Sequence, residues 1–248
     1  MIKQGIIFSA GLGTRFKPWT DQHPKALALV NGKSLLQRNV SYLQLYGISD
    51  LVVNIHHFAE QVIQAIDSNH GWGSRIQISD ERAMLLETGG GLLFAKDKFE
   101  KGKPFLSCNV DILTDLDINK LFQFHKDQNA LISFGVTNRP SSRYLLFDAS
   151  GRLAGWRNEK TKEEKIVRPG STFFPKAYSC VVIFAYEIFD LMKDKGFEGK
   201  FSLIDVYLAL AAEQRIMGFD HSGDRFVDVG KPASVAEAEI LFPTSGKH

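Results

Sequence analysis

The stretch that decides the fold is FSAGLGTRFKPWTDQHPKAL, residues Phe8 to Leu27. Ile2 to Phe8 leads into it and ends in a short apolar run, which predicts the opening strand of a buried sheet. Ser9 to Gly13 then carry almost no side-chain bulk, and glycine at 11 and 13 permits positive φ, so successive N–H groups can converge on an anion. Arg15 adds a planar fork of donors and Lys25 a compact positive charge. The stretch therefore predicts a loop that holds a phosphate chain between two fixed cations.

Two better-known phosphate loops do not fit this stretch. The Walker A loop is excluded because the chain has no GxxxxGK[ST] run at this position. The dinucleotide fingerprint GxGxxG is excluded because Phe16 stands where its third glycine belongs. A glycine pair after a strand is also compatible with an ordinary turn, so the prediction depends on the longer string that includes both cations.

The composition is that of a globular protein without a membrane span. The chain has 248 residues, 44% hydrophobic and 23% charged, and no apolar run approaches the roughly 20 residues that a spanning helix needs. The first residues lack the features of a secretory signal, and Cys108 and Cys180 lie in apolar runs, so we expect buried, reduced cysteines and a cytoplasmic protein. A net charge of +2 does not suggest nucleic-acid binding. The oligomeric state is left open.

Strands and helices alternate in the first half of the sequence. The apolar positions of Ser34 to Tyr46 recur at helical spacing, and Gly47 stands where a C-terminal cap belongs. Such alternation favours a mostly parallel, Rossmann-like sheet with helices on both faces, an α/β fold. The further predicted strands are 50–55, 76–79 and 105–109, and the further predicted helices are 59–66, 90–96 and 119–128.

The second half changes character, because several predicted strands follow one another without helices between them. This pattern predicts a small added antiparallel sheet. Residues 157–173 are rich in Lys, Glu and Gly and are interpreted as a long loop over a ligand, and the tail 243–248 is expected to lack regular structure. We predict one domain over residues 1–248, made of two halves, 1–128 and 129–248. The predicted strands are 130–137, 144–147, 153–156, 178–184, 216–219 and 225–227, and the predicted helices are 186–193, 203–213 and 233–241.

Two acidic residues end apolar runs. Asp111 closes the strand that begins at Phe105, at the edge where open α/β sheets bind ligands, and Asp228 ends the run before Val229 and Gly230. Two carboxylates together with phosphate oxygens are a common way of holding Mg²⁺, which keeps several of its waters. An isolated aspartate is also a common turn former, so the predicted Mg²⁺ site depends on the phosphate loop as supporting evidence.

Three glycines, Gly89 to Gly91, stand at the start of a predicted helix in the sequence LETGGG. Helix N-termini offer free N–H groups, and glycine permits close approach of a flat base or its phosphate. The alternative is a glycine-rich turn.

The string GLGTRFKPWT…PKAL resembles the signature of the sugar-1-phosphate nucleotidyltransferases, and ETGGG is most similar to the form found in N-acetylmuramate-1-phosphate uridylyltransferases. The resemblance implies that a nucleoside triphosphate, with UTP favoured, and a sugar 1-phosphate are the substrates and that Mg²⁺ is the cofactor. It also implies nucleotide-sugar synthesis, for example for the cell wall, with 1–128 as the nucleotide-binding half and 129–248 as the sugar-binding half. Val110 departs from the family, which usually has glycine before the aspartate. The implied catalytic residues are Arg15, Lys25 and Asp111, the implied metal ligands are Asp111 and Asp228, and the implied nucleotide-binding residues are Ala10, Gly11, Gly13, Thr14, Glu87, Thr88, Gly89, Gly90 and Asn109.

Asn158-Glu159-Lys160 resembles the E-K-P element of the same family, in which the lysine holds the sugar phosphate and the glutamate holds sugar hydroxyls. Thr161 replaces the proline here, and in so charged a run Lys162 or Lys165 could serve instead of Lys160. By position, Ser179 is expected to line the sugar pocket.

The expected activity is transfer of a nucleotidyl group from the triphosphate to the sugar 1-phosphate, with release of pyrophosphate. Guanylyl or cytidylyl transfer to heptose, mannose or a phospho-alcohol would use the same loop and metal. A regulatory protein that binds nucleotide sugars without chemistry is the alternative from another class, and retention of the two cations and two acids argues against it.

Overall fold

The structure is a computed structural model, and it describes residues 1–170 and 172–243. The chain divides into two compact units. The loop unit contains Lys3–Leu85, Cys108–Asp115 and the residues from Arg225 onward, and the hairpin unit contains Met1–Ile2, Leu86–Ser107 and Leu116–Asp224. The C-terminal segment thus joins the unit that carries the first loop. The expected single domain with halves 1–128 and 129–248 stays a prediction.

The loop unit is built on three parallel strands, β1 (Gln4–Phe8), β4 (Asp50–Ile55) and β5 (Arg75–Asp80). Phe8 pairs with Asn54 at the last position of the β1–β4 ladder. Parallel strands end at a common edge, so the segments that follow β1, β4 and β5 lie near one another. The three strands confirm the sequence prediction in this part of the sheet.

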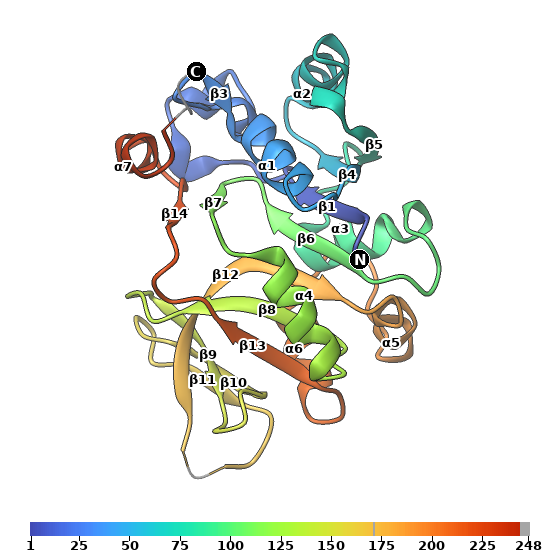
Figure 1. Ribbon diagram of the computed structural model, residues 1–248, viewed down its shortest axis with the longest axis vertical. Coiled ribbons are helices and arrows are strands. Elements are labelled where there is room, and N and C mark those ends of the chain that lie inside the picture. The colour runs from blue at the N-terminus through green and yellow to red at the C-terminus, as the bar shows by residue number, and fades with distance from the viewer. Residues whose placement is uncertain (171, 244–248) are drawn as a thin grey trace. The chain divides into compact units, whose positions relative to one another are not determined.

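Helices in the loop unit follow the predicted pattern closely. In α1 (Leu35–Gln44), the Ser34 hydroxyl caps the helix by accepting the N–H of Gln37 at 3.1 Å, and Gly47 has φ 73° after its end. Figure 1 shows α1 in blue beside β7 and α2 beside β5, as their contacts require. The other helices of this unit are α2 (Ala59–Ser68) and α7 (Ser234–Leu241), with single 3₁₀ turns at Thr14–Phe16, Trp19–Asp21, Lys25–Leu27 and His70–Gly73.

Two short antiparallel ladders complete the loop unit. One is the hairpin of β2 (Leu29–Val30) and β3 (Lys33–Ser34). The other joins β7 (Ile112–Thr114) to β14 (Phe226–Asp228). The sequence predicted a strand at 225–227, where β14 lies, but β2, β3 and β7 were not predicted.

The hairpin unit has a mixed sheet. β8 (Ile132–Thr137) pairs in parallel with β13 (Ile216–Asp220) and antiparallel with β12 (Phe174–Phe184), which also pairs antiparallel with β9 (Arg143–Phe147). The ladder then continues antiparallel to β10 and β11. The last two strands are β10 (Leu153–Asn158) and β11 (Glu164–Ile166).

Helices cover this sheet, and all six residues of β8 are buried. α4 packs against β8, and α6 against β10 and β13; Figure 1 shows α4 in green beside β8. The side chain of Asp117 caps α4 by accepting two backbone N–H groups. The helices of this unit are α3 (Glu87–Phe94), α4 (Ile118–Asp127), α5 (Ile188–Asp194) and α6 (Leu203–Ala211), with a 3₁₀ turn at Lys96–Lys98, and β6 (Phe105–Asn109) runs from this unit into the loop unit.

The long loop expected over 157–173 is wrong in part. β10 continues to Asn158, and Glu164–Ile166 forms β11, which pairs with β10 to close a hairpin. No apolar period indicated this strand in the sequence, because all three residues of β11 are exposed and two of them are charged. Residue 171 of the expected loop and 244–248 of the expected tail lie outside the described residues.

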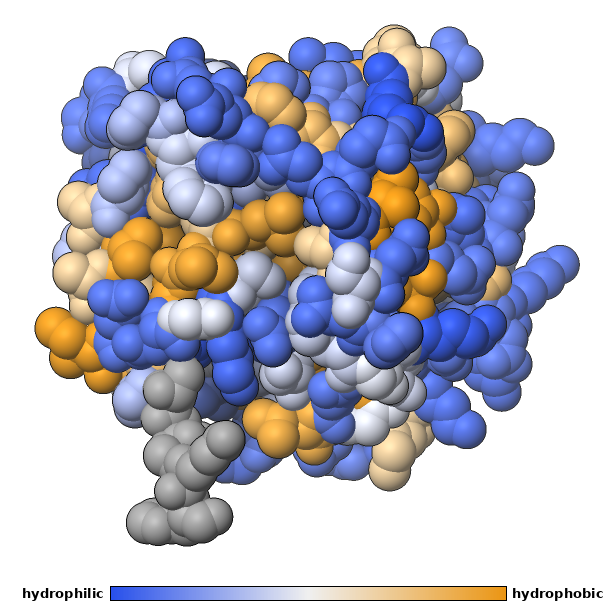
Figure 2. Space-filling view, turned by 90° about the horizontal axis from the view of Figure 1, so that it is seen from above, coloured by the Kyte–Doolittle hydropathy of each residue, from blue (hydrophilic) through white to orange (hydrophobic). Residues whose placement is uncertain are grey.

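The observed architecture confirms the predicted α/β class, with the added antiparallel sheet formed by β9 to β12. In the view of Figure 2, hydrophobic side chains gather in patches between hydrophilic ones. Among the described residues, no helix has the length and apolar character that crossing a membrane requires. The exposed large hydrophobic residues of the loop unit are Met84, Leu12, Leu29, Leu45 and Ile240.

Candidate nucleotide site and its relatives

The first loop is fixed where it leaves β1. The side-chain oxygen of Asn54 accepts the backbone N–H of Ser9 at 2.6 Å and that of Ala10 at 3.3 Å. The Ser9 hydroxyl in turn donates to the backbone carbonyl of Asn54. The Asn54 amide nitrogen donates to the buried carboxylate of Glu81 at 2.8 Å. Sequence reasoning missed Asn54 and Glu81, although Asn54 lies near the end of β4, which pairs with β1, and Glu81 directly follows β5, which pairs with β4.

Beyond this anchor the loop presents its backbone. The N–H groups of Gly11, Leu12 and Gly13 donate to no group in the part of the chain that the structure describes. Gly13 has φ 62° and precedes a helical turn, and this left-handed-to-helical sequence is the geometry of an anion-binding nest. Gly11 does not have positive φ, and a Cβ there would meet nothing within 4 Å. Only one of the two glycines is therefore needed for its φ, while open space beside the other leaves room for a ligand.

Arg15 and Asp228 both lie against the backbone of Gly230. A Cβ at Gly230 would lie 2.7 Å from Asp228 Oδ1 and 3.1 Å from Arg15 Nη2. This close approach explains why glycine follows Asp228 and Val229. Arg15 is exposed, next to Thr14 at the first 3₁₀ turn, so its guanidinium is accessible to a ligand.

Lys25 and Asp111 form an ion pair, with 2.5 Å between Nζ and Oδ2. Their side chains are 10% and 21% exposed, so the pair is largely shielded from water but remains accessible. The two residues are 86 positions apart, and the strand-end placement of Asp111 explains how they meet. Each side chain therefore neutralises the charge of the other.

The two predicted acidic residues come together on the β7–β14 ladder. Asp228 pairs with Ile112, and the N–H of Val229 donates to the carbonyl of Asp111 at 2.8 Å. The side chain of Val110 is buried, its N–H donates to Phe8 and its carbonyl accepts from Asn39, so valine in place of the family's glycine fits the interior. Asn109 is the last residue of β6, next to this ladder in the chain.

The donor set of the ladder fits Mg²⁺. Among the described residues no cluster of three His, Cys, Asp or Glu side chains could hold a metal ion. Mg²⁺ does not need such a cluster, because it commonly uses one or two carboxylates with substrate phosphates and water. Asp111 and Asp228, adjacent through their backbones, match that requirement.

The glycine-rich segment behaves differently from the prediction of free N–H groups. The amides of Gly89 and Gly90 both donate to the carbonyl of Phe201, at 3.0 and 3.1 Å, so the expectation is wrong for these two residues. A Cβ at Gly90 would lie 2.1 Å from the Gly199 carbonyl oxygen, which shows that glycine is required for packing. The Thr88 hydroxyl accepts the N–H of Leu203.

Glu87 begins α3 with φ 61°, and its carboxylate is exposed, 3.7 Å from the Lys200 ammonium group. Its position at a helix start leaves it accessible to a ligand in the hairpin unit.

Glu159 and Lys160 lie at the exposed turn between β10 and β11. Glu159 forms an ion pair with Lys162 at 3.0 Å, and Lys165 pairs with Glu163 at 3.5 Å. Lys160 forms no ion pair with any described residue, while its backbone N–H donates to Asn158. Of the three candidate lysines, Lys160 is therefore the one whose charge is available.

Ser179 lines none of the cavities described for this structure. Its side chain is fully buried, with its hydroxyl 2.7 Å from His221 Nε2, because it points to the opposite face of β12 from Tyr178. Tyr178 instead lines a cavity of about 350 Å³ within the hairpin unit. Aromatic walls with a few charged groups are typical of small-molecule pockets. The cavity is lined by Arg143, Tyr144, Leu145, Trp156, Lys165, Tyr178, Ser202, Ile204, Asp205 and Leu208.

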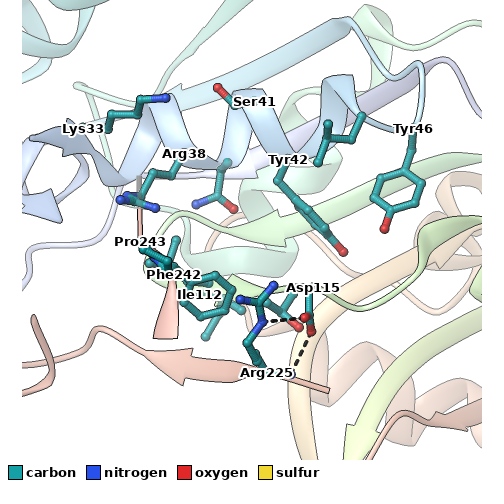
Figure 3. Close-up of a pocket in the computed structure, with 14 residues that line it drawn as sticks. Lys33, Arg38, Ser41, Tyr42, Tyr46, Ile112, Asp115, Arg225, Phe242 and Pro243 are labelled. Carbon is teal, nitrogen blue, oxygen red and sulfur yellow. Dashed lines mark hydrogen bonds and ion pairs between the residues drawn. The ribbon is translucent and has the colours of Figure 1, made fainter. Parts of the chain in front are cut away.

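A second cavity, of about 420 Å³, lies in the loop unit between α1 and the β7–β14 ladder. Figure 3 shows Tyr42 pointing from α1 toward it, and Arg225 beside Asp115 across it. Arg225 Nε donates to Asp115 at 2.7 Å, and burial lowers the pKa of Arg38, another lining residue. This cavity is lined by none of the predicted site residues.

Comparisons with known proteins agree with the geometry. The family described as nucleotidyl transferase matches residues 4–242. An N-acetylmuramate α-1-phosphate uridylyltransferase of Neisseria meningitidis is 31% identical over 96% of this chain and 97% of its own length. A mannose-1-phosphate guanyltransferase of Yarrowia lipolytica is 25% identical, and the match covers 98% of this chain but only 64% of that protein.

Solved structures share the fold. A putative glucose-1-phosphate thymidylyltransferase of Bacillus anthracis superposes with a TM-score of 0.80 at 16% identity, covering 100% of this chain and 98% of that one. The extent of the family match and the identity to the Neisseria protein confirm the resemblance inferred from the first loop. The chain belongs to the nucleotidyl transferase family of enzymes.

Proposed function

We propose that this enzyme transfers a nucleotidyl group from a nucleoside triphosphate, preferentially UTP, to a sugar 1-phosphate, and releases pyrophosphate. The observation that carries the proposal is the first loop. Its amides at Gly11 to Gly13, which have no partner among the described residues, precede Arg15 and Lys25, in the unit that also brings Asp111 beside Asp228. A polyphosphate with a bound divalent cation is the ligand that such a set of donors and acceptors fits best.

The reaction needs alignment more than acid–base chemistry. An oxygen of the sugar phosphate bonds to the α-phosphorus, the bond from that phosphorus to the bridging oxygen breaks, and its electron pair leaves with pyrophosphate. A phosphate monoester is mostly dianionic at neutral pH, since its second pKa is about 6, so its oxygen needs no general base. Positioning and neutralisation of charge dominate such transfers.

The loop unit supplies that neutralisation. The amides of the loop and the guanidinium of Arg15 would bind the oxygens of the triphosphate, and Lys25 would neutralise charge that develops on the leaving pyrophosphate. Asp111 and Asp228 would hold Mg²⁺, which would neutralise phosphate charge when bound. Lys25 and Asp111 already hold each other in place before substrate arrives.

The hairpin unit would bind the acceptor. We propose that Lys160 binds the sugar phosphate and that Glu159 binds sugar hydroxyls, with the aromatic cavity beside Trp156 and Tyr178 as the sugar pocket. The available charge of Lys160 supports this assignment over Lys162, which pairs with Glu159. Lys165, which lines the cavity, is the second candidate.

Two relatives bear on the choice of nucleotide. The Neisseria uridylyltransferase matches 96% of the chain and supports UTP with an N-acetylmuramate-type acceptor, hence a role in cell-wall precursor synthesis. The Yarrowia guanyltransferase supports GTP with mannose 1-phosphate as the second candidate. We propose a cytoplasmic location, because neither Cys108 nor Cys180 forms a disulfide among the described residues, as is usual in a reducing compartment.

The test is pyrophosphate release across UTP, GTP, CTP and dTTP with a panel of sugar 1-phosphates, including N-acetylmuramate, mannose and glucose forms. We expect the highest kcat/KM with UTP and the N-acetylmuramate compound, in the presence of Mg²⁺. Release only with GTP and mannose 1-phosphate would support the second candidate. Ligand-induced thermal stabilisation without release in any combination would reject the enzymatic proposal in favour of a sensor.

A further inference from the structure

The start of the first loop is held by a buried relay of two side chains, Asn54 and Glu81. The Asn54 amide lies between two partners, the N–H groups of Ser9 and Ala10 on one side and the Glu81 carboxylate on the other. Both side chains are 2% exposed, so neither can touch a ligand. All of these residues belong to the loop unit.

The orientation of the Asn54 amide is set by its two partners. Backbone N–H groups can only donate, so they require the amide oxygen, and an ionised carboxylate can only accept, so it requires the amide nitrogen. The two requirements agree: Oδ1 faces Ser9 and Ala10, and Nδ2 lies 2.8 Å from Glu81 Oε1. A reversed amide would place two donors together at the loop and two acceptors together at Glu81.

Glu81 is itself fixed by the sheet. It follows β5, and its N–H donates to the carbonyl of Ile55 at 2.8 Å, one residue beyond Asn54. A buried carboxylate is costly unless it is satisfied, so an acidic residue at this point needs a reason that a neutral residue would not supply. Glutamine has the same shape but presents either an oxygen or an NH₂ group, so only the N–H groups of Ser9 and Ala10 would then set the orientation of the Asn54 amide.

The consequence reaches the ligand-binding part of the loop. The N–H groups of Ser9 and Ala10 are used by Asn54, and those of Gly11, Leu12 and Gly13, immediately after them, find no acceptor among the described residues. Loss of the acceptor at Ala10 would leave a buried N–H unsatisfied and release the entry to the nest.

We propose that Asn54 and Glu81 are positioning residues for triphosphate binding, in which Glu81 sets the Asn54 amide and Asn54 fixes the loop. The inference rests on the proposed function, because it assumes that the loop binds the triphosphate. Asn54 and Glu81 would not contact either substrate, and they would affect the binding of the triphosphate but not that of the sugar phosphate.

The test compares three variants with wild type. Glu81→Gln replaces the carboxylate, which only accepts hydrogen bonds, with an amide that can accept or donate toward Asn54. We expect KM for the preferred triphosphate to rise about tenfold, with KM for the sugar phosphate within about twofold. Asn54→Asp places two carboxylates against each other, and we expect a larger rise, about 100-fold. Combining Asn54→Asp with Glu81→Gln restores both hydrogen bonds, with donor and acceptor exchanged between positions 54 and 81. The aspartate carboxylate would accept from the loop N–H groups on one side and from the glutamine NH₂ group on the other. We expect this double variant to return KM to within about threefold of wild type.

Asp80→Asn is the matched control, since Asp80 precedes Glu81 but is exposed and pairs with Arg82. It should leave both KM values unchanged. Rescue by the double variant is the decisive readout, because loss of structure alone would make two buried substitutions worse than one. If either single variant does not fold, the double variant compared with the other single variant carries the same test, and failure of all three to fold would overturn the proposal.

Triphosphate binding by calorimetry separates this inference from the proposed function. If wild type binds no nucleoside triphosphate, the proposed function fails and the inference fails with it. If wild type binds and Glu81→Gln binds equally well, or if both KM values rise together, the relay is overturned while the proposed function stands.

Discussion

The ammonium group of Lys25 lies 2.5 Å from the carboxylate of Asp111, across 86 residues of sequence. The pair places a positive and a negative group side by side in the unit that carries the first loop. A triphosphate with a bound divalent cation offers each of them a new partner of opposite charge, so the pair is suited to hold both residues in place until substrate binds.

Asp111→Asn is expected to lower turnover by about 100-fold or more, a loss typical of removing one electrostatic stabiliser. The asparagine still accepts a hydrogen bond from Lys25, so we expect the melting temperature to fall by only about 2 to 4 °C. Pyrophosphate release at saturating Mg²⁺ and a thermal melt measure the two effects. Near-wild-type turnover would reject the assignment of Asp111.

Arg15→Ala is expected to raise KM for the triphosphate about 10- to 100-fold, since a charge-assisted hydrogen bond contributes about 1.5 to 3 kcal/mol. Lys17→Ala is the matched control, because Lys17 is 62% exposed and pairs with Asp21 at 2.9 Å. Initial rates over a range of triphosphate concentrations give both KM values. Equal effects of the two substitutions would show that Arg15 acts only through the general charge of the surface.

The sequence predicted those parts of the fold in which hydrophobic period or strand ends carry the signal. The β4 strand repeats the predicted range, and Asp111 follows β6 at the strand end where the sequence placed it. Its ion pair with Lys25 was not predicted. Ser34 and Gly47 marked the ends of α1 through capping chemistry that acts within a few residues.

The rest depended on partners far away in the sequence. Nothing near Gly89 shows that its N–H is used by Phe201, and nothing near Asn54 shows that Glu81 sets its amide. Ser179 was misplaced because neighbouring residues of a strand face opposite sides, and a shift of one residue exchanges an interior group for a pocket group. Sequence period cannot fix such a choice where both faces of the strand are covered.

Gly13→Ala and Gly11→Ala should have different effects. Gly13 has φ 62°, and a Cβ there would lie 2.8 Å from Thr20 Cγ2, so we expect alanine to cost about 1 to 3 kcal/mol of stability. Gly11 has neither constraint, and alanine there should leave the melting temperature unchanged while raising KM for the triphosphate. Equal loss of stability in the two variants, measured by denaturant unfolding, would contradict the distinction.

Lys160→Ala is expected to raise KM for the sugar phosphate about tenfold or more and to leave KM for the triphosphate within about twofold, because it removes an available charge. Lys162 already pairs with Glu159, so Lys162→Ala should change neither value much. Lys165→Ala distinguishes the remaining candidate, which lines the aromatic cavity. If only Lys165→Ala raises KM for the sugar phosphate, the phosphate contact belongs to Lys165 instead.

His125 should make the protein less stable in mild acid. Burial lowers its pKa from 6.5 to about 4, and its Nδ1 lies 3.0 Å from the Ser133 hydroxyl. The unfolded chain therefore binds a proton between these two pH values that the folded chain does not. Stability from this group is present above pH 6.5 and is lost as the pH falls toward 4, by about 3 kcal/mol for a shift of this size.

Urea unfolding between pH 7 and pH 4.5 measures this dependence, with His125→Gln as the variant that cannot titrate. Glutamine retains a hydrogen-bonding group opposite Ser133, so we expect it to be less stable than wild type at pH 7 but to lose less stability on acidification. The two curves should approach one another as the pH falls, because only the wild-type chain has an imidazole at position 125 that takes up a proton on unfolding and so lowers the free energy of unfolding. Parallel curves over this range would mean that the His125 side chain reaches water and titrates alike in the folded and unfolded chain.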